Sequence, residues 1–429
     1  MENVSRVSTS PYRLKKHLTV MHAVSLAVGM VIGAGYLVIP GIVYQASGKA
    51  AFSAWILNGL VIIPLLVMFA RIGALHPSAD GLSGYFGIAF GKHACHSMQI
   101  LVLITFILAM PAIAVVGGEY AAYVLHLNEQ TIYYIAALFF ISACCVNMGG
   151  VVISARVQNV LSFTLFFVLF LVAIGSLLFG DHSISSITEL VSFQPTILKN
   201  GSVLGTIFFA FIGWEMLSFT SEEFKNPQRD FPLALLISYI FVMVLYLGIG
   251  AAIQLNLSEN DPLLLRSPIS GLLLKVFGHG FAMGLGYLAI IIVLANVNGA
   301  MLAVSRLVYA SARSGLLPKM LSLLNPKSQV PSNAVIAISF CFIVILVLVA
   351  TGLTSQSFLF RLAGKTFFLI YLLSAFAYFR LARNIMEKLL GLICILVCLG
   401  VASTYGFDLL FPIAVLCAGW FWSACRCKD

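Results

Sequence analysis

Long runs without a charged residue dominate this sequence. Each of four runs holds more than twenty consecutive residues that include no Asp, Glu, Lys or Arg. They lie at 50–70, 157–180, 231–258 and 276–305. A helix of about 20 mostly apolar residues crosses the hydrocarbon core of a bilayer, so each run is long enough to span a membrane. The runs therefore predict an all-α integral membrane protein.

The composition excludes a soluble protein of this length. Of the 429 residues, 61% are hydrophobic and 9% are charged, and the mean hydropathy is +1.04. A soluble protein carries about 25% charged residues, which cover its surface. We therefore expect lipid to surround most of the chain, which has room for about 10–14 spans.

Charged residues divide the chain into twelve candidate spanning helices. An amphipathic stretch at 81–95 leads into the third of them. The expected helices are 19–45, 52–74, 96–122, 130–148, 154–179, 202–222, 231–255, 277–308, 333–351, 357–380, 387–404 and 408–425.

The positive charges are unevenly divided between the two sides of these helices. If the tail at 1–18 is cytoplasmic, 18 of the 24 Lys and Arg residues fall in cytoplasmic segments. Positive charge is enriched on the cytoplasmic side of membrane proteins. The pattern predicts that both termini are cytoplasmic, in the inner membrane of a bacterium. The net charge of +9 is then a topology signal, and we expect no nucleic acid partner. The six basic residues on the opposite side are Lys49, Lys199, Arg266, Lys275, Arg361 and Lys365.

No group of residues has the pattern of a catalytic or metal site. The nine cysteines are odd in number, lie mostly in apolar runs and lack metal-ligand spacing. No nucleophile is paired with a base, and no phosphate-binding loop is present. The first apolar segment is too long for a signal peptide and is interpreted as a span. We expect no cofactor and no metal, and a membrane enzyme is a remote alternative.

The first span contains an unusual concentration of glycine. Gly29, Gly33 and Gly35 fall within seven residues, and Pro40 follows. Glycine costs about 1 kcal/mol in a helix interior and proline about 3 kcal/mol, so this span is expected to be weakened or unwound. Irregular backbone at membrane depth is tolerated where it lines a cavity. A packing face is the alternative, because Gly29 and Gly33 have GxxxG spacing.

The sixth span carries an acidic residue near its middle. Only 15 uncharged residues separate Lys199 from Glu215. A carboxylate at the bilayer centre costs about 2.5–3.5 kcal/mol on insertion scales, so Glu215 is expected to face a polar cavity or to be protonated. Gly213 lies close to Glu215 and is a residue at which the helix is expected to be interrupted.

The two breaks fall in spans one and six, which are corresponding members of two five-helix halves. Such paired interruptions are typical of a transporter site between inverted repeats. Amides at the start of a half-helix hold a carboxylate, and carbonyls at the end of a half-helix hold an ammonium. The backbone would thus bind an amino acid zwitterion. Phe209, Phe211 and Trp214 would then contact its side chain.

Several motifs resemble the amino acid–polyamine–organocation (APC) superfamily. They are VIGAGYLVIPG in the first span, HPSADGLSGYFGIAFG before the third, FIGWE in the sixth, SEEFKNPQRDFP after it, and SRLVYASARSGLLP at 305–318. Within the superfamily the chain is most similar to bacterial exporters of methionine and branched-chain amino acids. The resemblance implies a LeuT-like fold, with a first repeat at 19–180, a second at 199–382, and two added helices at 386–425. Helices one and six would be unwound at mid-membrane.

The resemblance also implies roles for individual residues. Gly33, Ala34 and Gly35 match the carboxylate-binding turn. The carbonyls of Phe209 and Ile212 match those that receive the amino group, and Glu215 matches an acidic position linked to gating and proton response. Proton-coupled relatives often carry a lysine in helix five, but here 159–179 contains none, and Thr164 lies near the expected place.

Three other polar residues, Lys365, Asn296 and His22, have two interpretations each. Lys365 either extends its side chain to the outer interface or faces the cavity as a gating charge, with Glu119 as a candidate partner. Asn296 either lines the cavity or bridges helices. His22 is expected at the membrane interface, with a pH role as the alternative.

The predicted function is secondary transport of neutral aliphatic amino acids by alternating access. Methionine, leucine, isoleucine and valine are the leading substrates, and proton-coupled efflux is the expected mode. An importer or exchanger of the same superfamily is the alternative. A membrane amino acid sensor is the alternative from a different class, although the short loops argue against it. The sequence leaves the oligomeric state open.

Overall fold

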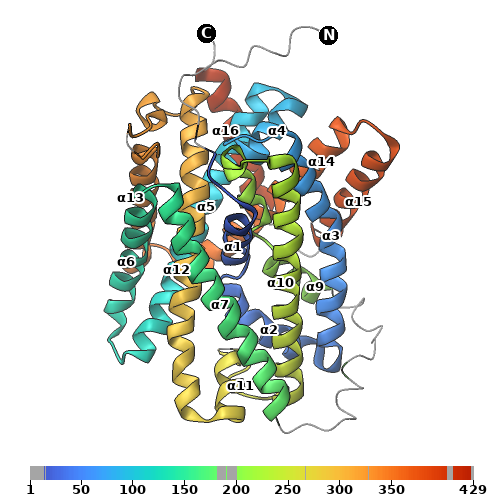
Figure 1. The fold of residues 1–429 in the computed structure, drawn as a ribbon, viewed down its shortest axis with the longest axis vertical. Helices are drawn as coiled ribbons and strands as arrows, with labels where there is room; N and C mark the ends of the chain where they lie inside the picture. Colours follow the sequence, from blue (N-terminus) through green and yellow to red (C-terminus); the bar gives the residue numbers. More distant parts are fainter. Residues whose placement is uncertain are drawn as a thin grey trace.

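The computed structural model describes residues 14, 16–180, 190, 201–265, 267–326, 328–402 and 409–426. Helices account for nearly all regular structure in these residues, and no extended strand occurs among them. Figure 1 shows the long helices running along the long axis of the molecule. The prediction of an all-α membrane fold is confirmed.

Every predicted span coincides with one helix or with a broken pair of helices. In the described residues, nine helical segments are long and apolar enough to cross a membrane, so the full number of twelve spans stays a prediction. The helices are α1 (Val20–Val31), α2 (Ala34–Ser47), η1 (Gly48–Ala50), α3 (Ala51–Leu75), α4 (Gly81–Phe90), α5 (Lys92–Val124), α6 (Glu129–Met148), α7 (Val151–Phe179), α9 (Gly201–Ala210), η3 (Trp214–Glu223), α10 (Pro227–Asn256), α11 (Pro268–Phe277), α12 (His279–Arg313), η4 (Lys319–Ser322), α13 (Ser332–Ala350), α14 (Gln356–Leu381), α15 (Ile385–Ala402) and α16 (Leu410–Arg426).

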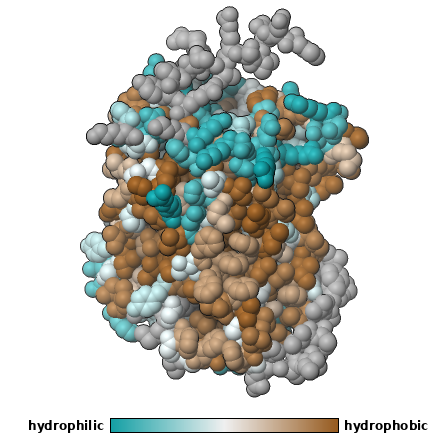
Figure 2. Space-filling model, in the orientation of Figure 1, coloured by the Kyte–Doolittle hydropathy of each residue, from teal (hydrophilic) through white to brown (hydrophobic). Residues whose placement is uncertain are grey.

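The outer surface of the bundle is apolar. On α7, Val160, Phe163, Phe167 and Leu171 are 48–66% exposed and follow one another at helical spacing. Figure 2 shows hydrophobic residues over the middle of the visible face and hydrophilic residues gathered at its upper end. Soluble monomers rarely expose apolar patches of more than a few hundred Å². This surface is therefore suited to contact with lipid chains.

Helix α12 lies at the centre of the bundle. In its most apolar 18-residue window, 83% of the residues are buried, compared with 28% for α6 and for α7. It packs against α5, α7, α6 and α1, while α10 packs against α3 and α1. Side chains on α12 can therefore contact several helices at once.

Two helical segments are interrupted within the bundle. Helix α1 ends at Val31, and α2 begins at Ala34 after the irregular residues Ile32 and Gly33. Helix α9 ends at Ala210, and the 3-10 helix η3 begins after Gly213, which has φ 132° and ψ −16°. Only glycine adopts such a conformation readily. The depth of these interruptions in a bilayer stays a prediction.

Two pairs of helices share a second irregular geometry. The ten-residue helix α4 joins the long helix α5 through Gly91, with φ 97° and ψ 175°. The ten-residue helix α11 joins the long helix α12 through Gly278, with φ 85° and ψ −178°. A short helix, a glycine with positive φ and a long helix thus recur in the same order in the two parts of the chain.

Candidate functional site

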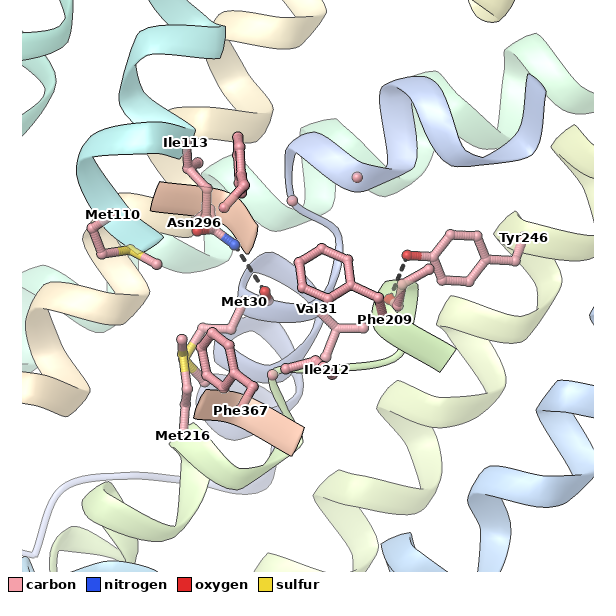
Figure 3. A pocket seen from close by; sticks show the side chains of 15 residues that line it. Met30, Val31, Met110, Ile113, Phe209, Ile212, Met216, Tyr246, Asn296 and Phe367 are labelled. Atoms are coloured by element: carbon pink, nitrogen blue, oxygen red, sulfur yellow. Dashed lines mark hydrogen bonds between the residues drawn. The ribbon is translucent and has the colours of Figure 1, made fainter. Parts of the chain in front are cut away.

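A cavity of about 60 Å³ lies between the two interruptions (Figure 3). Residues from α1, α2, α5, α9, η3, α10, α12 and α14 line it. They are Met30, Val31, Gly33, Gly35, Met110, Ile113, Phe209, Ala210, Ile212, Gly213, Met216, Tyr246, Asn296, Phe360 and Phe367. The two broken segments, which are distant in sequence, therefore form one site.

The end of α1 presents carbonyl oxygens beside this cavity. The last carbonyls of a helix lack intrahelical donors and carry partial negative charge. Asn296 of α12 donates through Nδ2 to the carbonyl of Met30 at 2.8 Å and of Gly29 at 3.4 Å. The start of α2 presents the opposite polarity, because the first-turn amides of Ala34 and Gly35 have no intrahelical acceptor. The interruption thus provides acceptors and donors on its two sides.

The end of α9 is fixed by short-range hydrogen bonds and by α10. Tyr246 donates through its hydroxyl to the carbonyl of Ala210 at 2.7 Å. The amide of Ile212 donates to the carbonyl of Phe209 at 3.2 Å. A carbonyl oxygen has two lone pairs, so Phe209 can accept a second hydrogen bond from a ligand.

The cavity wall is apolar. Of the lining residues, none is Asp, Glu, Lys, Arg or His. Three flexible methionines and the rings of Phe209, Phe360 and Phe367 belong to this wall. Burying an unpaired charge costs several kcal/mol, so a charged ligand side chain has no partner here. The wall suits an uncharged apolar group.

Most of the predicted substrate residues line the cavity. Gly33, Gly35, Phe209, Ile212, Gly213 and Asn296 belong to the lining, and Ala34 begins α2 between the two glycines.

Phe211 and Trp214 lie outside this lining. The Phe211 ring is fully buried and packs 5.1 Å from that of Tyr246 and 6.3 Å from that of Trp55. Trp214 is fully buried, with its ring 6.5 Å from that of Tyr239. The irregular turn after Ala210 directs these two side chains into packing contacts on the α3 and α10 side.

Sequence reasoning missed the lining residues from α5, α10 and α14. Met110 and Ile113 are three residues apart on α5, and Phe360 and Phe367 are seven apart on α14. Both spacings place residues on one helix face. The same spacing occurs in ordinary packing faces, so it did not distinguish these residues as site residues.

Glu215 lies behind the cavity wall and does not line it. Its Oε2 accepts hydrogen bonds from the amide of Gly213 at 3.0 Å and the hydroxyl of Tyr371 at 2.5 Å. The residue is 1% exposed, and Oε1 has no hydrogen-bond partner in the structure. Among the described residues, no ion pair involves Glu215. It therefore connects the irregular turn to α14 through neutral partners alone.

The other polar candidates are not among the residues that line the cavity. Lys365 is half-buried on α14, His22 is half-buried on α1, and Glu119 is exposed on α5. On α7, Thr164 is exposed on the outer surface. The α7 residues that reach α1 are instead Gln158 and Ser162, because they lie four residues apart on the inner face.

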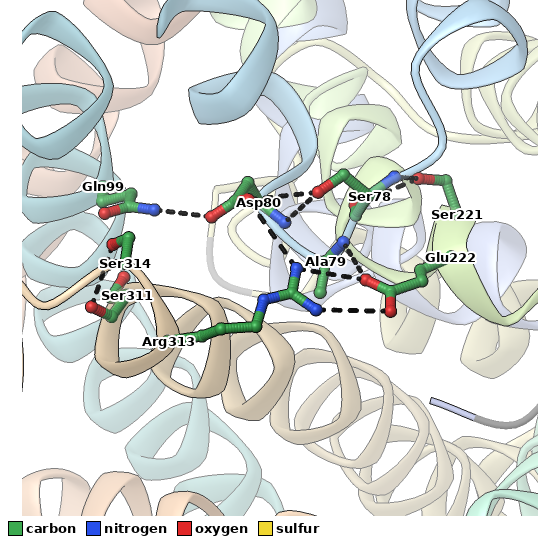
Figure 4. Close-up of polar contacts among 9 residues, drawn as sticks. All are labelled: Ser78, Ala79, Asp80, Gln99, Ser221, Glu222, Ser311, Arg313 and Ser314. Atoms are coloured by element: carbon green, nitrogen blue, oxygen red, sulfur yellow. Dashed lines mark hydrogen bonds and ion pairs between the residues drawn. The ribbon is translucent and has the colours of Figure 1, made fainter. Parts of the chain in front are cut away.

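An ion-pair cluster connects three elements at one end of the bundle (Figure 4). This cluster consists of Asp80 before α4, Glu222 at the end of η3 and Arg313 at the end of α12. The Arg313 Nη2 atom lies 3.4 Å from Glu222 Oε2 and 3.9 Å from Asp80 Oδ2. Gln99 donates to Asp80 Oδ1 at 2.7 Å. Burial raises the pKa of the Asp80 carboxyl, and the positive charge of Arg313 opposes this rise.

A fully buried ion pair lies next to this cluster. Arg306 Nε of α12 donates to Glu223 Oε1 of η3 at 2.6 Å, and both side chains are 0% exposed. The Glu223 carbonyl accepts hydrogen bonds from the amides of His17 and Leu18 at 2.9 Å each. The segment before α1, the end of η3 and α12 are therefore held together at this end.

No metal site accompanies these features. Across the part of the chain that the structure describes, no three His, Cys, Asp or Glu residues form a group that could hold a metal ion.

Comparison with known proteins gives one consistent family. The model of the amino acid permease family matches residues 18–424. The chain is 26% identical over 421 residues to an uncharacterized amino acid permease of Bacillus subtilis, covering 95% of this chain and 96% of that one. It is 24% identical over 412 residues to the L-methionine/branched-chain amino acid exporter of Escherichia coli, covering 95% and 96%. The solved structure of MhsT in complex with L-phenylalanine is similar in fold, with a TM-score of 0.60 and 17% identity, covering 92% of this chain and 100% of that one.

Proposed function

Because this chain belongs to the amino acid permease family, we propose that it carries neutral, mostly aliphatic amino acids across the membrane. The observation that carries the proposal is the apolar cavity between two interrupted helical segments. Its lining holds no Asp, Glu, Lys, Arg or His side chain, while backbone donors and acceptors lie at its edge. Methionine, leucine, isoleucine and valine fit this combination.

The backbone binds the carboxylate and the ammonium group, which all these substrates share. The amides at the start of α2, beside Gly33, hold the carboxylate at the positive end of the helix dipole. The carbonyls at the ends of α1 and α9, including that of Phe209, accept hydrogen bonds from the ammonium. The apolar wall, with Met110 and Phe367, then contacts the substrate side chain.

Transport proceeds by alternating access between two inverted repeats. The recurrence of a short helix, a positive-φ glycine and a long helix around Gly91 and Gly278 supports a repeat. So does the occurrence of one interruption in each half, at Gly33 and at Gly213. Substrate sites of such transporters lie at the repeat interface.

The transport mode that we propose is efflux coupled to protons. Similarity to the Escherichia coli exporter supports efflux, and the buried Glu215 is the candidate proton-binding group. With both termini in the cytoplasm, the ion-pair cluster of Asp80, Glu222 and Arg313 closes the cytoplasmic side of the inner membrane transporter.

A counterflow assay in proteoliposomes tests the substrate class. Vesicles loaded with unlabelled methionine should accumulate labelled methionine, leucine, isoleucine and valine, because these side chains fit the uncharged wall. Labelled arginine, lysine, aspartate and glutamate should stay near the level of protein-free vesicles. The variant Phe167→Ala, altered on the outer face of α7, serves as a matched control and should behave like the unaltered protein. Efficient exchange of arginine or glutamate without methionine would contradict the proposed substrate class.

A further inference from the structure

Asn296 of α12 is a buried amide that only half satisfies its hydrogen-bonding capacity. The residue is 2% exposed and lines the cavity. Its Nδ2 donates to the carbonyls of Met30 and Gly29, whereas its Oδ1 has no hydrogen-bond partner in the structure. Buried polar groups in native proteins are nearly always paired, so an unpaired oxygen beside a cavity requires an explanation.

The orientation of this amide is determined by its neighbours. Two carbonyl oxygens, of Met30 and Gly29, face one end of the amide group, and only the nitrogen can donate to them. Rotating the amide by half a turn would bring its oxygen against both carbonyls. Figure 3 shows the Asn296 nitrogen directed toward Met30, with the oxygen on the other side. The free acceptor is therefore Oδ1.

Asn298, two residues further along α12, provides an internal comparison. It is 3% exposed, and its Nδ2 donates to Gln158 Oε1 at 2.8 Å. Its Oδ1 accepts a hydrogen bond from Asn147 Nδ2 at 3.1 Å. Both ends of the Asn298 amide are thus used within the protein, as expected for an asparagine that connects helices. Asn296 is equally buried but keeps one end unused.

We propose that Asn296 Oδ1 binds the ammonium group of the amino acid substrate. This inference rests on the proposed function and assigns a side chain to a task so far given to backbone carbonyls. An amide oxygen is a good acceptor for an ammonium, and a hydrogen bond to a charged group is about twice as strong as one between neutral groups. Exclusion of water from the cavity strengthens it further.

The surrounding side chains allow the ligand to reach this oxygen. Met30, Met110 and Met216 line the cavity with unbranched side chains, and such side chains adopt new rotamers readily. The Asn296 nitrogen, fixed by the α1 carbonyls, keeps the oxygen in place when the substrate enters. Asn296 thus holds the end of α1 through its nitrogen and binds the substrate's amino group through its oxygen.

The test measures the affinity of two ligands for purified full-length variants. The ligands are methionine and 4-(methylthio)butanoic acid, which has the same chain and carboxylate but no amino group. Asn296→Ala should weaken methionine binding about tenfold or more, and should change binding of the deaminated ligand less than twofold. Asn298→Ala is the matched control. It should lower the midpoint of thermal unfolding without changing the ratio of the two affinities.

The affinities of the Asn296 variants distinguish binding of the ammonium group from a role that is limited to capping α1. If Asn296→Ala lowers the affinity for both ligands equally, or for neither of them, Asn296 only caps α1 and the inference is wrong. If the unaltered protein binds no neutral amino acid, the proposed function itself fails, and the inference fails with it. Should Asn296→Ala not fold, Asn296→Ser, which also lacks the amide oxygen, is measured with the same two ligands and the same criteria.

Discussion

Glu215 combines a structural contact with a position suited to proton binding. Its Oε2 atom accepts hydrogen bonds from the Gly213 amide and from the Tyr371 hydroxyl. These two hydrogen bonds hold the irregular turn against α14. Its Oε1 atom is buried without a donor. An ionised carboxylate in such surroundings loses solvation that two neutral donors only partly replace. We therefore expect the proton occupancy of Glu215 to differ between a closed, dry state and an open, wet state, and such a difference is the requirement for coupling by linkage.

Glu215→Gln should separate transport from proton coupling. Glutamine retains the shape and the hydrogen-bond acceptor but fixes the uncharged form. In proteoliposomes with an acidic lumen, proton antiport by the unaltered protein should drive labelled methionine inward. The variant should lose this accumulation and the pH dependence of transport while retaining exchange at zero gradient. An unchanged pH profile would mean that Glu215 only stabilises the turn, and accumulation with acid outside would indicate symport and import.

At the scale of single elements, the close approach of the two interrupted segments depends on Gly213. A Cβ atom at this position would lie 3.1 Å from the Met30 carbonyl oxygen and 3.1 Å from Cγ2 of Val31. Its φ of 132° is also unfavourable for any L residue with a side chain. The end of α1 and the start of η3 can therefore approach this closely only where a side chain is absent.

Gly213→Ala should destabilise the protein and weaken substrate binding. The strained backbone alone costs about 1–3 kcal/mol, and movement of α1 away from η3 would widen the site. Thermal unfolding and methionine affinity of the purified variant measure the two effects. Gly280→Ala is the control, because nothing lies within 4 Å of a Cβ at this helical position. Equal stability of the two variants would contradict the role of Gly213.

The sequence predicted the helical elements well because apolar residues follow one another almost without interruption along each span. In a membrane span nearly every residue between two charges is apolar, and the helix of α7 or α10 follows from that run alone. The two interruptions were also predictable, because Gly33 and Gly213 stand out in helical surroundings. Side-chain directions within the irregular turn were not predictable. Phe211 and Trp214 follow no helical period there, and their packing on α10 depends on tertiary contacts.

At the scale of the whole molecule, charges from distant parts of the chain meet at one end of the bundle. Asp80, Glu222 and Arg313 belong to three different elements, and each is only partly exposed. Movement of η3 away from α12 has to separate Glu222 from Arg313. A transporter that opens at this end must break the cluster in each cycle.

Arg313→Ala should favour the state that is open at this end. A cysteine introduced by Met216→Cys, in a background without exposed native cysteines, reports access from the cytoplasmic side in inside-out vesicles. Alkylation by a membrane-impermeant reagent should be about fivefold faster after Arg313→Ala. This ratio corresponds to a change of about 1 kcal/mol in the free-energy difference between the closed and the open state. Arg71→Ala is the control, since Arg71 pairs with Glu387 on α15 at 2.9 Å and does not touch the cluster. Equal alkylation rates in all variants would exclude the cluster as a gate.

The buried pair of Glu223 and Arg306 also constrains how the chain is made. The two residues are 83 positions apart, so the ribosome completes η3 well before α12. At about 5–20 residues per second, the interval between them is about 4–17 s. During this time Glu223 lacks the Arg306 side chain that pairs with it in the folded protein. Because burying an unpaired carboxylate costs several kcal/mol, we expect the end of η3 to reach its buried position only after α12 is present.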